Sequence, residues 1–335
     1  MKFSEVIIIG GGPAGSTCAW KLKQSKKDCI LLDSQKFPRT KLCAGWITPK
    51  VIDQLELSDY PNIQLNDNYV NFFGIDKKLK SKSYAIRRYE FDDWLLKRSG
   101  VDVYHHKVHN IKQQDGFYII DDVYKCKYLV GAGGSHCPVY ISFFKAIHPR
   151  NKNYEVCCLE EEIKYDHKDK ACRCWFYEHN IQGYSWCVSK NDGYLNIGVG
   201  GLFKGEKVNI KEHWDQLVKK LDSLNIVKNY DFKPKGYVYQ IRDRVEHCRL
   251  DNAFIIGDAA GLATTDLGEG IGPAVESAFL AADTIINNSE FDLHSIHKKS
   301  NPVAMGIMLF LWRTIHFFTI KNPFKSPKDG WKIDE

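Results

Sequence analysis

A glycine-rich turn near the N-terminus constrains the fold of this 335-residue chain more than any other feature. Residues 6–9 are all β-branched, and such an uninterrupted apolar run predicts a parallel strand that is buried on both faces. The turn follows at residues 10–15, and a helix is expected over 16–22. A second strand over 29–33 completes a βαβ unit of the size that binds dinucleotides.

The spacing Gly-x-Gly-x-x-Gly gives each glycine of the turn a separate role. Gly10 permits the tight turn, Gly12 lets the backbone approach a pyrophosphate, and Gly15 allows the helix to pack closely on the strand. A carboxylate at the end of the second strand can accept hydrogen bonds from a ribose diol. An ordinary glycine-rich turn is the alternative. The residues expected to contact a cofactor here are Gly10, Gly12, Pro13, Ala14, Gly15 and Asp33.

A second strand-to-glycine motif occurs at residues 252–261. Its apolar run predicts a strand that brings Gly257 and Asp258 to a turn of small residues. Gly270 and Ile271 then open a long predicted helix. Asp258 either contacts a cofactor or only caps a helix, because aspartate is a common N-cap residue.

Together these motifs resemble the FAD-binding fold of the glutathione-reductase type, in its hydroxylase-like branch. By this resemblance Asp258 binds the ribityl chain of FAD, and Gly270 and Ile271 lie at the isoalloxazine ring. Residues 88–95 resemble the Arg-x-x-Phe-Asp-x-x-Leu helix start of the same branch, which implies that Arg88 lies near the flavin. The alternative for Arg88 is a surface charge beside a helix N-terminus.

The middle motif of that branch departs here from its usual form. Where the family has Gly-Ala-Asp-Gly, residues 131–134 read Gly-Ala-Gly-Gly, so that Gly133 replaces the aspartate. In flavin hydroxylases this aspartate helps to place FAD and NAD(P)H, and its replacement counts against an NAD(P)H-driven hydroxylase. The chain also has no second Gly-x-Gly-x-x-Gly turn for a nicotinamide domain. The electron donor, NAD(P)H or ferredoxin, therefore stays open.

Residues 41–45 resemble the Lys-x-Cys-Gly-Gly segment of the geranylgeranyl reductase family, with Ala44 in place of its first glycine. The resemblance implies that Lys41 contacts the cofactor. Cys43 is the candidate catalytic residue, because a thiol beside the flavin can gate access or assist proton delivery. The alternative is the commoner fate of cysteine, a small buried apolar residue.

Residues 184–189, with Gly198 and Gly200 after them, resemble a second motif of that family, Tyr-x-Trp-x-Phe-Pro followed by Gly-x-Gly. By this resemblance Tyr184 and Trp186 line an apolar substrate pocket. The alternative is a pair of core aromatics, because residues two apart on a strand share a face. Valine and serine replace the Phe-Pro pair, which leaves the substrate open.

These patterns predict an α/β protein with a Rossmann-like FAD-binding domain, an antiparallel β-sheet substrate domain and a helical C-terminus. The FAD-binding domain is expected to be discontinuous, over 1–60, 84–150 and 246–290, and the substrate domain to comprise 61–83 and 151–245. Turn residues separate four short predicted strands, at 155–162, 172–177, 184–188 and 194–199. Helical spacing predicts one amphipathic helix over that sheet, through Trp214, Leu217, Val218 and Leu221.

Residues 291–335 are expected to form an apolar helix and a tail. The segment 303–320 is nearly apolar all round but falls short of the ~20 residues of a clean membrane span. We rank three alternatives: a buried helix that closes the substrate tunnel, an interfacial membrane helix, and a spanning anchor. Peripheral membrane contact through 302–320 is the second of these, and the lysines that follow suit an anionic surface.

Charge and cysteine usage exclude several classes. The 47 basic and 41 acidic residues are scattered and give a net charge of +6, which argues against a nucleic-acid partner. Eleven cysteines without a C-x-x-C pair argue against a disulfide framework, and the lack of ligand spacing predicts no metal site. The N-terminus has no signal-peptide cleavage region, so we expect a cytoplasmic protein, with a peripheral membrane location as the alternative.

The prediction for function is an FAD-dependent oxidoreductase. By resemblance to geranylgeranyl reductases, it reduces carbon-carbon double bonds of an isoprenoid or other lipid by hydride transfer from reduced flavin. One alternative is an FAD-dependent monooxygenase or halogenase-like enzyme, of which the halogenase is disfavoured by the absence of a Trp-x-Trp-x-Ile-Pro motif. Another is an electron-transfer flavoprotein that passes electrons to a quinone or a protein partner.

Overall fold

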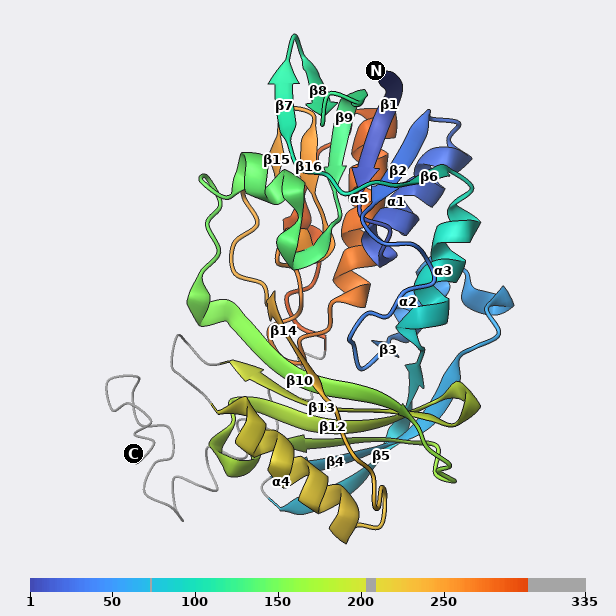
Figure 1. Ribbon diagram of the computed structural model, residues 1–335, viewed down its shortest axis with the longest axis vertical. Coiled ribbons are helices and arrows are strands. Elements are labelled where there is room, and N and C mark those ends of the chain that lie inside the picture. The colour runs from blue at the N-terminus through green and yellow to red at the C-terminus, as the bar shows by residue number, and fades with distance from the viewer. Residues whose placement is uncertain (73, 203–208, 301–335) are drawn as a thin grey trace.

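The computed structural model describes residues 1–72, 74–202 and 209–300. In this part of the chain two eight-stranded sheets lie at opposite ends of the molecule (Figure 1). Helices pack on the mainly parallel first sheet, and the second sheet is mainly antiparallel. The predicted fold class, a Rossmann-like α/β unit joined to an antiparallel sheet, is confirmed for these residues.

The first sheet is built around β1 (Lys2–Ile9), which pairs in parallel with β2 (Cys29–Asp33) on one side and β9 (Tyr124–Gly131) on the other. β6 (Asp102–His105) extends the parallel sheet beyond β2, and β16 (Ala253–Ile255) extends it beyond β9. Three further strands complete it: β7 (Ile111–Gln114), β8 (Phe117–Ile120) and β15 (Arg249–Leu250). The strands predicted at 6–9 and 29–33 are therefore confirmed.

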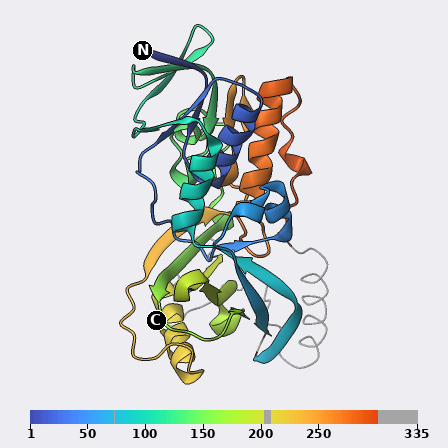
Figure 2. The ribbon, with the colours of Figure 1, turned by 90° about the vertical axis from the view of Figure 1, so that its right-hand side faces the viewer.

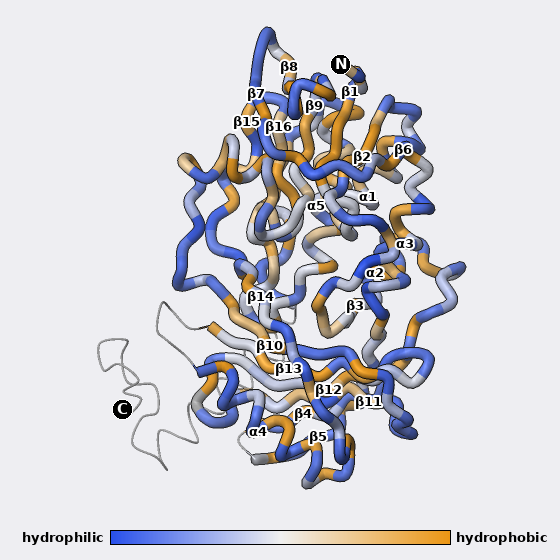
Figure 3. The backbone as a smooth tube through the Cα atoms, in the orientation of Figure 1, coloured by the Kyte–Doolittle hydropathy of each residue, from blue (hydrophilic) through white to orange (hydrophobic). Residues whose placement is uncertain are grey.

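Apolar contacts on both faces of β1 explain its uninterrupted β-branched run. Val6 and Ile8 pack with α1 (Pro13–Gln24) and α5 (Ile271–Asn287), and Ile7 and Ile9 lie in a separate core on the opposite face. α3 (Arg88–Ser99) lies beside α1, and Figure 2 shows the three helices side by side. Figure 3 shows the hydrophobic residues concentrated along these central strands.

The second sheet has the strand order β14-β10-β13-β12-β11-β4-β5-β3. Its strands are β3 (Trp46–Ile47), β4 (Gln64–Phe72), β5 (Ile75–Ala85), β10 (Glu155–Lys164), β11 (Ala171–Phe176), β12 (Gly183–Lys190), β13 (Tyr194–Leu202) and β14 (Lys235–Gln240). Its neighbouring strands are antiparallel except β11 and β4, which are parallel. No short turn joins these two strands, so a hairpin does not impose the antiparallel direction on them.

The two faces of the second sheet have different environments. α4 (Ile210–Ser223) covers one face, where Trp214, Leu217 and Leu221 pack against strand residues such as Trp175 and Ile197. This confirms the predicted amphipathic helix. The other face points toward the first sheet and borders a cavity. Because side chains alternate along a strand, each strand contributes every second residue to that cavity face.

Strand pairing shifts two expected boundaries. β3 lies within 1–60, which was expected to belong to the FAD-binding domain, but it pairs with β5 in the second sheet. β5 ends at Ala85, beyond the expected segment 61–83. Both differences have one cause, the pairing of Trp46 with Ala85. This pairing makes the segment before α2 (Pro49–Gln54) the edge strand of the second sheet.

The predicted apolar helix at 303–320, and with it the membrane contact through 302–320, lies outside the described residues. Before it, the described chain contains only a short 3-10 turn, Leu293–Ser295, after α5. Within the described ranges no helix combines the length and the apolar character that crossing a bilayer requires.

Candidate functional site

A cavity of about 1100 Å³ lies between the two sheets. Ligand pockets for drug-sized molecules typically measure about 300–1,000 Å³, so this cavity has room for a large ligand. One side, here called the glycine wall, comprises Gly10, Gly12, Arg39 and Arg88, and the opposite side, the aromatic wall, comprises Tyr184, Trp186, Tyr237 and Tyr239. The sequence therefore brings its N-terminal turn and the strands of the second sheet to one space.

The N-terminal turn leaves its backbone open to the cavity. Gly10, Gly12, Pro13 and Ala14 line it, whereas Gly15 lies beneath them. A methyl group on Gly15 would lie 1.8 Å from the carbonyl oxygen of Gly10, so only glycine allows α1 to approach the strand this closely. Gly12 caps α1 without a side-chain hydrogen bond, which leaves N–H groups of the first helical turn available for an anion.

Two guanidinium groups lie beside this helix N-terminus. A Cβ atom on Gly12 would lie 3.6 Å from Arg39 Nη2 and 4.0 Å from Arg88 Nη2. Asp92, which is fully buried, accepts bonds of 2.6 and 2.7 Å from Nε and Nη2 of Arg88 and lies 3.1 Å from Arg39 Nη1. Burial disfavours the charged form of Arg88, but the Asp92 carboxylate favours that form more strongly. The pKa of Arg88 is therefore raised above its ordinary value. Two fixed cations and a free helix N-terminus fit a pyrophosphate.

Arg88 is 8% exposed, so it is not a surface charge, and its contact with a flavin remains a prediction. Sequence reasoning missed Arg39 entirely. The signal that could have identified Arg39 is its position two residues before Lys41 of the Lys-x-Cys segment.

Asp33 borders the cavity but also stabilises the turn itself. Its Oδ2 accepts a 2.7 Å hydrogen bond from Gly11 N, and its Oδ1 accepts one of 2.8 Å from Gln35 N. Both carboxylate oxygens therefore have backbone donors within the chain. Its contact with a ribose remains a prediction.

The second glycine motif lies on the same cavity. Asp258 sits in the 3-10 turn Gly257–Ala259, and a Cβ on Gly270 would lie 3.1 Å from its Oδ1. Among the described residues the Asp258 carboxylate has no hydrogen-bond donor, so it can bind a ligand hydroxyl. Gly257 lies below the surface, where its N–H donates to Ser277 Oγ at 3.0 Å. Gly270 and Ile271 line the cavity at the start of α5.

Arg150 supports this turn from behind, and sequence reasoning missed it. Its Nη2 donates to the carbonyl oxygens of Asp258 and Ala259, at 3.4 and 3.2 Å. The arginine therefore holds the backbone of the turn and leaves the carboxylate of Asp258 free to face the cavity.

Cys43 lies between the two walls. Its thiol accepts a hydrogen bond from Gly45 N at 3.3 Å and interacts with the Arg88 guanidinium, and its carbonyl oxygen accepts one from Lys190 Nζ at 3.1 Å. Lys41 also lines the cavity, but its ammonium lies 5.5 Å from the ring centroid of Tyr237, on the aromatic side. The two residues of this motif therefore contact different walls.

The aromatic wall comes from alternate residues of β12 and β14. Tyr184 Oη donates to the carbonyl of Leu267 at 2.6 Å, and Trp186 Nε1 donates to Asn196 Oδ1 at 2.7 Å. A Cβ on Gly198 would lie 2.2 Å from the Trp186 ring, so the glycine makes room for the indole. Both predicted pocket residues line the cavity and are also part of an apolar cluster, so the two interpretations of this pair are compatible.

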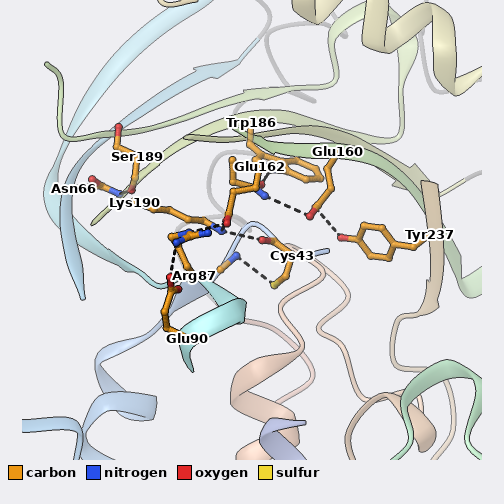
Figure 4. A network of polar contacts seen from close by, with 12 residues as sticks. Cys43, Asn66, Arg87, Glu90, Glu160, Glu162, Trp186, Ser189, Lys190 and Tyr237 are labelled. Atoms are coloured by element: carbon orange, nitrogen blue, oxygen red, sulfur yellow. Dashed lines mark hydrogen bonds and ion pairs between the residues drawn. The ribbon is translucent and has the colours of Figure 1, made fainter. Parts of the chain in front are cut away.

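A network of buried charges continues the cavity face of the same sheet (Figure 4). The Lys190 ammonium, whose side chain is fully buried, lies 2.7 Å from Glu162 Oε2, and Arg87 Nε donates to Glu162 Oε1 at 2.8 Å. Burial favours the neutral acid, but Lys190 and Arg87 together lower the pKa of Glu162. Glu160, two residues earlier on β10, contacts Tyr237 and Asn196 instead. Sequence reasoning found none of this network.

The cysteines and histidines form no metal centre in the described ranges, where no group of three or more His, Cys, Asp and Glu side chains is placed to hold an ion. Cys172 and Cys174 share the cavity face of β11 and are buried. A contact with Cys172, together with burial, raises the pKa of Cys174 well above its ordinary value, which keeps the thiol protonated.

Comparison with known proteins supports a Rossmann-like N-terminal domain. Residues 8–61 match a family described as an NAD(P)-binding Rossmann-like domain. An uncharacterized protein of Methanosarcina barkeri is 29% identical over 328 residues, which cover 92% of this chain and 82% of that relative. Protein CbrA of Shigella dysenteriae is 27% identical over 320 residues, which cover 87% of this chain and 86% of that relative.

A geranylgeranyl bacteriochlorophyll reductase-like protein from Thermoplasma acidophilum superposes with a TM-score of 0.74 and 18% identity, covering 94% of this chain and 84% of that one. The chain has the fold of this geranylgeranyl bacteriochlorophyll reductase-like protein. This confirms, for the fold, the resemblance that the motifs suggested.

The same fold is found in flavin-dependent enzymes of another class. The flavin-dependent brominase Bmp2 superposes with a TM-score of 0.67 and 16% identity, covering 93% of this chain and 84% of that one. The halogenase PltM, solved with phloroglucinol and FAD, has a TM-score of 0.65 and 14% identity, covering 88% and 71%. One fold serves several reactions, so the reaction has to be argued from the site.

Proposed function

We propose that this protein is an FAD-dependent oxidoreductase that reduces carbon-carbon double bonds of an isoprenoid or other lipid. The observation that carries the proposal is the aromatic wall, which lies across one cavity from a turn suited to a dinucleotide. A site of this kind holds an apolar chain beside a bound cofactor and excludes water from it.

The residues of the glycine wall fit FAD. The pyrophosphate would lie at Gly12 and the α1 N-terminus, between Arg39 and Arg88. Asp258 would bind the ribityl chain, and the backbone at Gly270, at the start of α5, would line the ring. When bound and reduced, FAD supplies a hydride equivalent, and the protein supplies alignment, water exclusion and protons.

The aromatic wall argues for an apolar substrate. Tyr184 and Trp186 present rings 5.6 Å apart, and Phe176 packs behind Tyr184 at 5.0 Å. The hydroxyl of Tyr184 and the indole N–H of Trp186 already have partners within the chain. These side chains therefore offer mainly carbon surface to a ligand, which suits a prenyl chain better than a polar one.

A flavin monooxygenase or halogenase is the second candidate, supported by the similarity to Bmp2 and PltM. Such an enzyme uses oxygen at the flavin, so the requirement for oxygen separates it from an alkene reductase. NAD(P)H or ferredoxin is proposed as the electron donor, and a peripheral membrane contact through 302–320 is also proposed.

Flavin absorbance tests the proposal directly. We would reduce the purified protein with dithionite without oxygen, then add prenyl lipids, and finally admit oxygen. Reoxidation of the flavin by a prenyl lipid without oxygen is the expected result. Reoxidation by oxygen alone would move the assignment to the monooxygenase class, and a protein without a flavin spectrum would overturn both candidates.

The variant Asp258→Ala tests the cofactor assignment separately. It removes a cavity-facing carboxylate, so we expect a loss of bound FAD. Asp231→Ala, which removes an exposed carboxylate outside the cavity, is the matched control and should retain FAD. Stoichiometric yellow flavin in Asp258→Ala would rule out the ribityl role.

A further inference from the structure

Glu160 is a fully buried acid with a single hydroxyl partner. It lies on β10, on the cavity face of the second sheet, and none of its surface is exposed. Tyr237 Oη lies 3.2 Å from its Oε2, and Asn196 Nδ2 donates to its Oε1 at 3.4 Å. Figure 4 shows the contact between the carboxyl group of Glu160 and Tyr237. A carboxyl group placed in this way needs either a cation or a proton.

The nearby cation is committed to another acid. Lys190 Nζ contacts Glu162 Oε2 at 2.7 Å and the carbonyl of Cys43 at 3.1 Å, and Glu162 also receives Arg87. The groups that face Glu160 are Lys190 from β12, Asn196 from β13, Tyr237 from β14, Cys158 from its own strand and the backbone of Cys43. Burial outweighs the favourable contacts and raises the pKa of Glu160. The acid therefore keeps its proton to a higher pH than an exposed glutamate does.

Tyr237 connects this acid to the cavity. Its side chain lines the cavity, and its ring stacks on that of Tyr239 with centroids 5.8 Å apart. Burial, with Cys158 and Glu160 beside it, raises the pKa of Tyr237 well above its ordinary value, so the phenol stays protonated. Tyr237 thus lines the cavity, and its neutral hydroxyl lies in hydrogen-bond contact with the buried acid.

Glu269 lines the cavity, and burial raises its pKa as well. Its carboxylate, however, accepts hydrogen bonds from Gly272 N at 2.9 Å and from Ser300 Oγ at 3.3 Å. Those donors stabilise the charged form and tie it to the start of α5. Glu160 also has a backbone contact, with Cys43, but it differs from Glu269 in its hydrogen bond with the hydroxyl of Tyr237, a residue that lines the cavity.

We propose that Tyr237 is the proton donor of the reduction and that Glu160 is the positioning residue that replaces its proton. The inference rests on the proposed function. The carbon-carbon π bond breaks and two C–H bonds form: the two electrons arrive with the hydride from reduced FAD at one carbon. The proton at the other carbon leaves Tyr237 Oη. Glu160 returns a proton to Oη, and solvent later reprotonates Glu160, so that the protein ends unchanged.

Infrared spectroscopy tests the acid without any turnover. The difference spectrum between wild type and Glu160→Gln should contain the carbonyl stretch of a protonated carboxyl group at neutral pH. Tyr237→Phe, which removes the hydrogen-bond partner, should shift that band, whereas Tyr239→Phe, from the same strand, should leave it in place. An ionised Glu160 at neutral pH would overturn the inference.

Single-turnover kinetics test the donor. We would reduce the FAD-loaded protein without oxygen and follow reoxidation by a prenyl lipid as a function of pH. Tyr237→Phe should retain FAD and accept electrons normally, but reoxidise about 10²-fold more slowly, the effect expected for a missing general acid. In wild type the reoxidation rate should decline at high pH, where Glu160 loses its proton. Glu160→Gln should abolish this pH dependence, and Glu160→Asp should restore part of the pH dependence. A Tyr237→Phe rate equal to that of wild type would overturn the inference.

The two proposals fail differently. A wild-type flavin that no prenyl lipid reoxidises contradicts the proposed function. A wild-type flavin that is reoxidised, together with an unaffected Tyr237→Phe, contradicts only the proton donor. Circular dichroism and flavin absorbance of each variant exclude a folding defect as the cause of a slow rate.

Discussion

The glycine wall and the aromatic wall face the same cavity but are built in different ways. The glycine wall relies on backbone atoms and on side chains from short contiguous motifs at 10–15 and 39–43, together with α3. The aromatic wall relies on single side chains from strands that are far apart in the sequence, such as Tyr184 on β12 and Tyr237 on β14. A binding surface made of backbone is therefore local in sequence, whereas one made of side chains on a sheet is not.

The walls also hold their charges differently. On the glycine wall the buried Asp92 holds Arg88 and Arg39 beside the space for a ligand phosphate. On the aromatic side Glu162 pairs with Lys190 and Arg87, and none of these three residues lines the cavity. The first arrangement suits an anionic ligand, whereas the second keeps these three charges off the cavity lining.

The largest effect is expected at the base of the glycine wall. The methyl group of Gly15→Ala would lie 1.8 Å from Gly10 O, so α1 has to move away from the strand. We expect a loss of about 3 kcal/mol of stability, at the upper end for overpacking, together with loss of FAD. Chemical denaturation and flavin content measure both effects. Gly116→Ala, in the hairpin between β7 and β8, is the control for FAD content and should keep FAD, although its φ of +77° strains an alanine there. Retention of FAD by Gly15→Ala would show that the turn tolerates movement.

Arg88→Met should have the next largest effect, because it leaves the buried Asp92 with only Arg39. Removing one partner of a buried pair costs roughly 3 kcal/mol, and the remaining arginine should reduce this to about 2–3. FAD affinity, measured by fluorescence titration, should fall as well. Arg173→Met breaks a pair with the exposed Asp169 and should change stability by less than about 1 kcal/mol. An equal loss of stability in Arg88→Met and Arg173→Met would contradict the role of the buried pair between Arg88 and Asp92.

A change confined to the aromatic wall should spare the cofactor. In Gly198→Ala the new methyl group would lie 2.2 Å from the Trp186 ring, so the indole has to turn into the cavity. We expect about 1–2 kcal/mol of lost stability, unchanged FAD content and an altered preference for lipid chain shape. Gly236→Ala on β14, where the methyl group meets only ordinary contacts, is the control. Loss of FAD in Gly198→Ala would show that the walls are coupled.

The smallest effect is a dependence of stability on pH that comes from the aromatic side. The pKa of Glu160 is raised in the folded protein above its ordinary value of 4.5, so its contribution is fully present below about pH 4.5 and is lost as the pH rises through the folded pKa. The stability of wild type relative to Glu160→Gln should therefore decline with rising pH, by about 1 kcal/mol per pH unit within that window. Denaturation curves of the two proteins at several pH values measure this. A relative stability that rises with pH would mean that the folded protein stabilises the ionised carboxylate.

Sequence patterns anticipated the first sheet better than the second. The β-branched run at 6–9 and the helix after it were predicted because their neighbours in space are also close in sequence. The parallel pairing of β11 with β4 was not, because the partner strand lies about a hundred residues earlier and no turn motif connects them. Likewise, residues 1–60 were assigned to the FAD-binding domain as a whole, and the pairing of β3 with β5 was not predicted.

The candidate site divides in the same way. The amino-acid sequence by itself determined the glycine turn, the Asp258 turn and the common strand face of Tyr184 and Trp186. Each of these depends on residues a few positions apart, which a single strand or turn brings together. Only the tertiary structure decided that Arg39 joins Arg88 at Gly12 and that Glu160 lies behind Tyr237. A charged side chain is stabilised or neutralised by whatever lies within a few ångströms of it, and those neighbours come from strands and helices that only folding brings together.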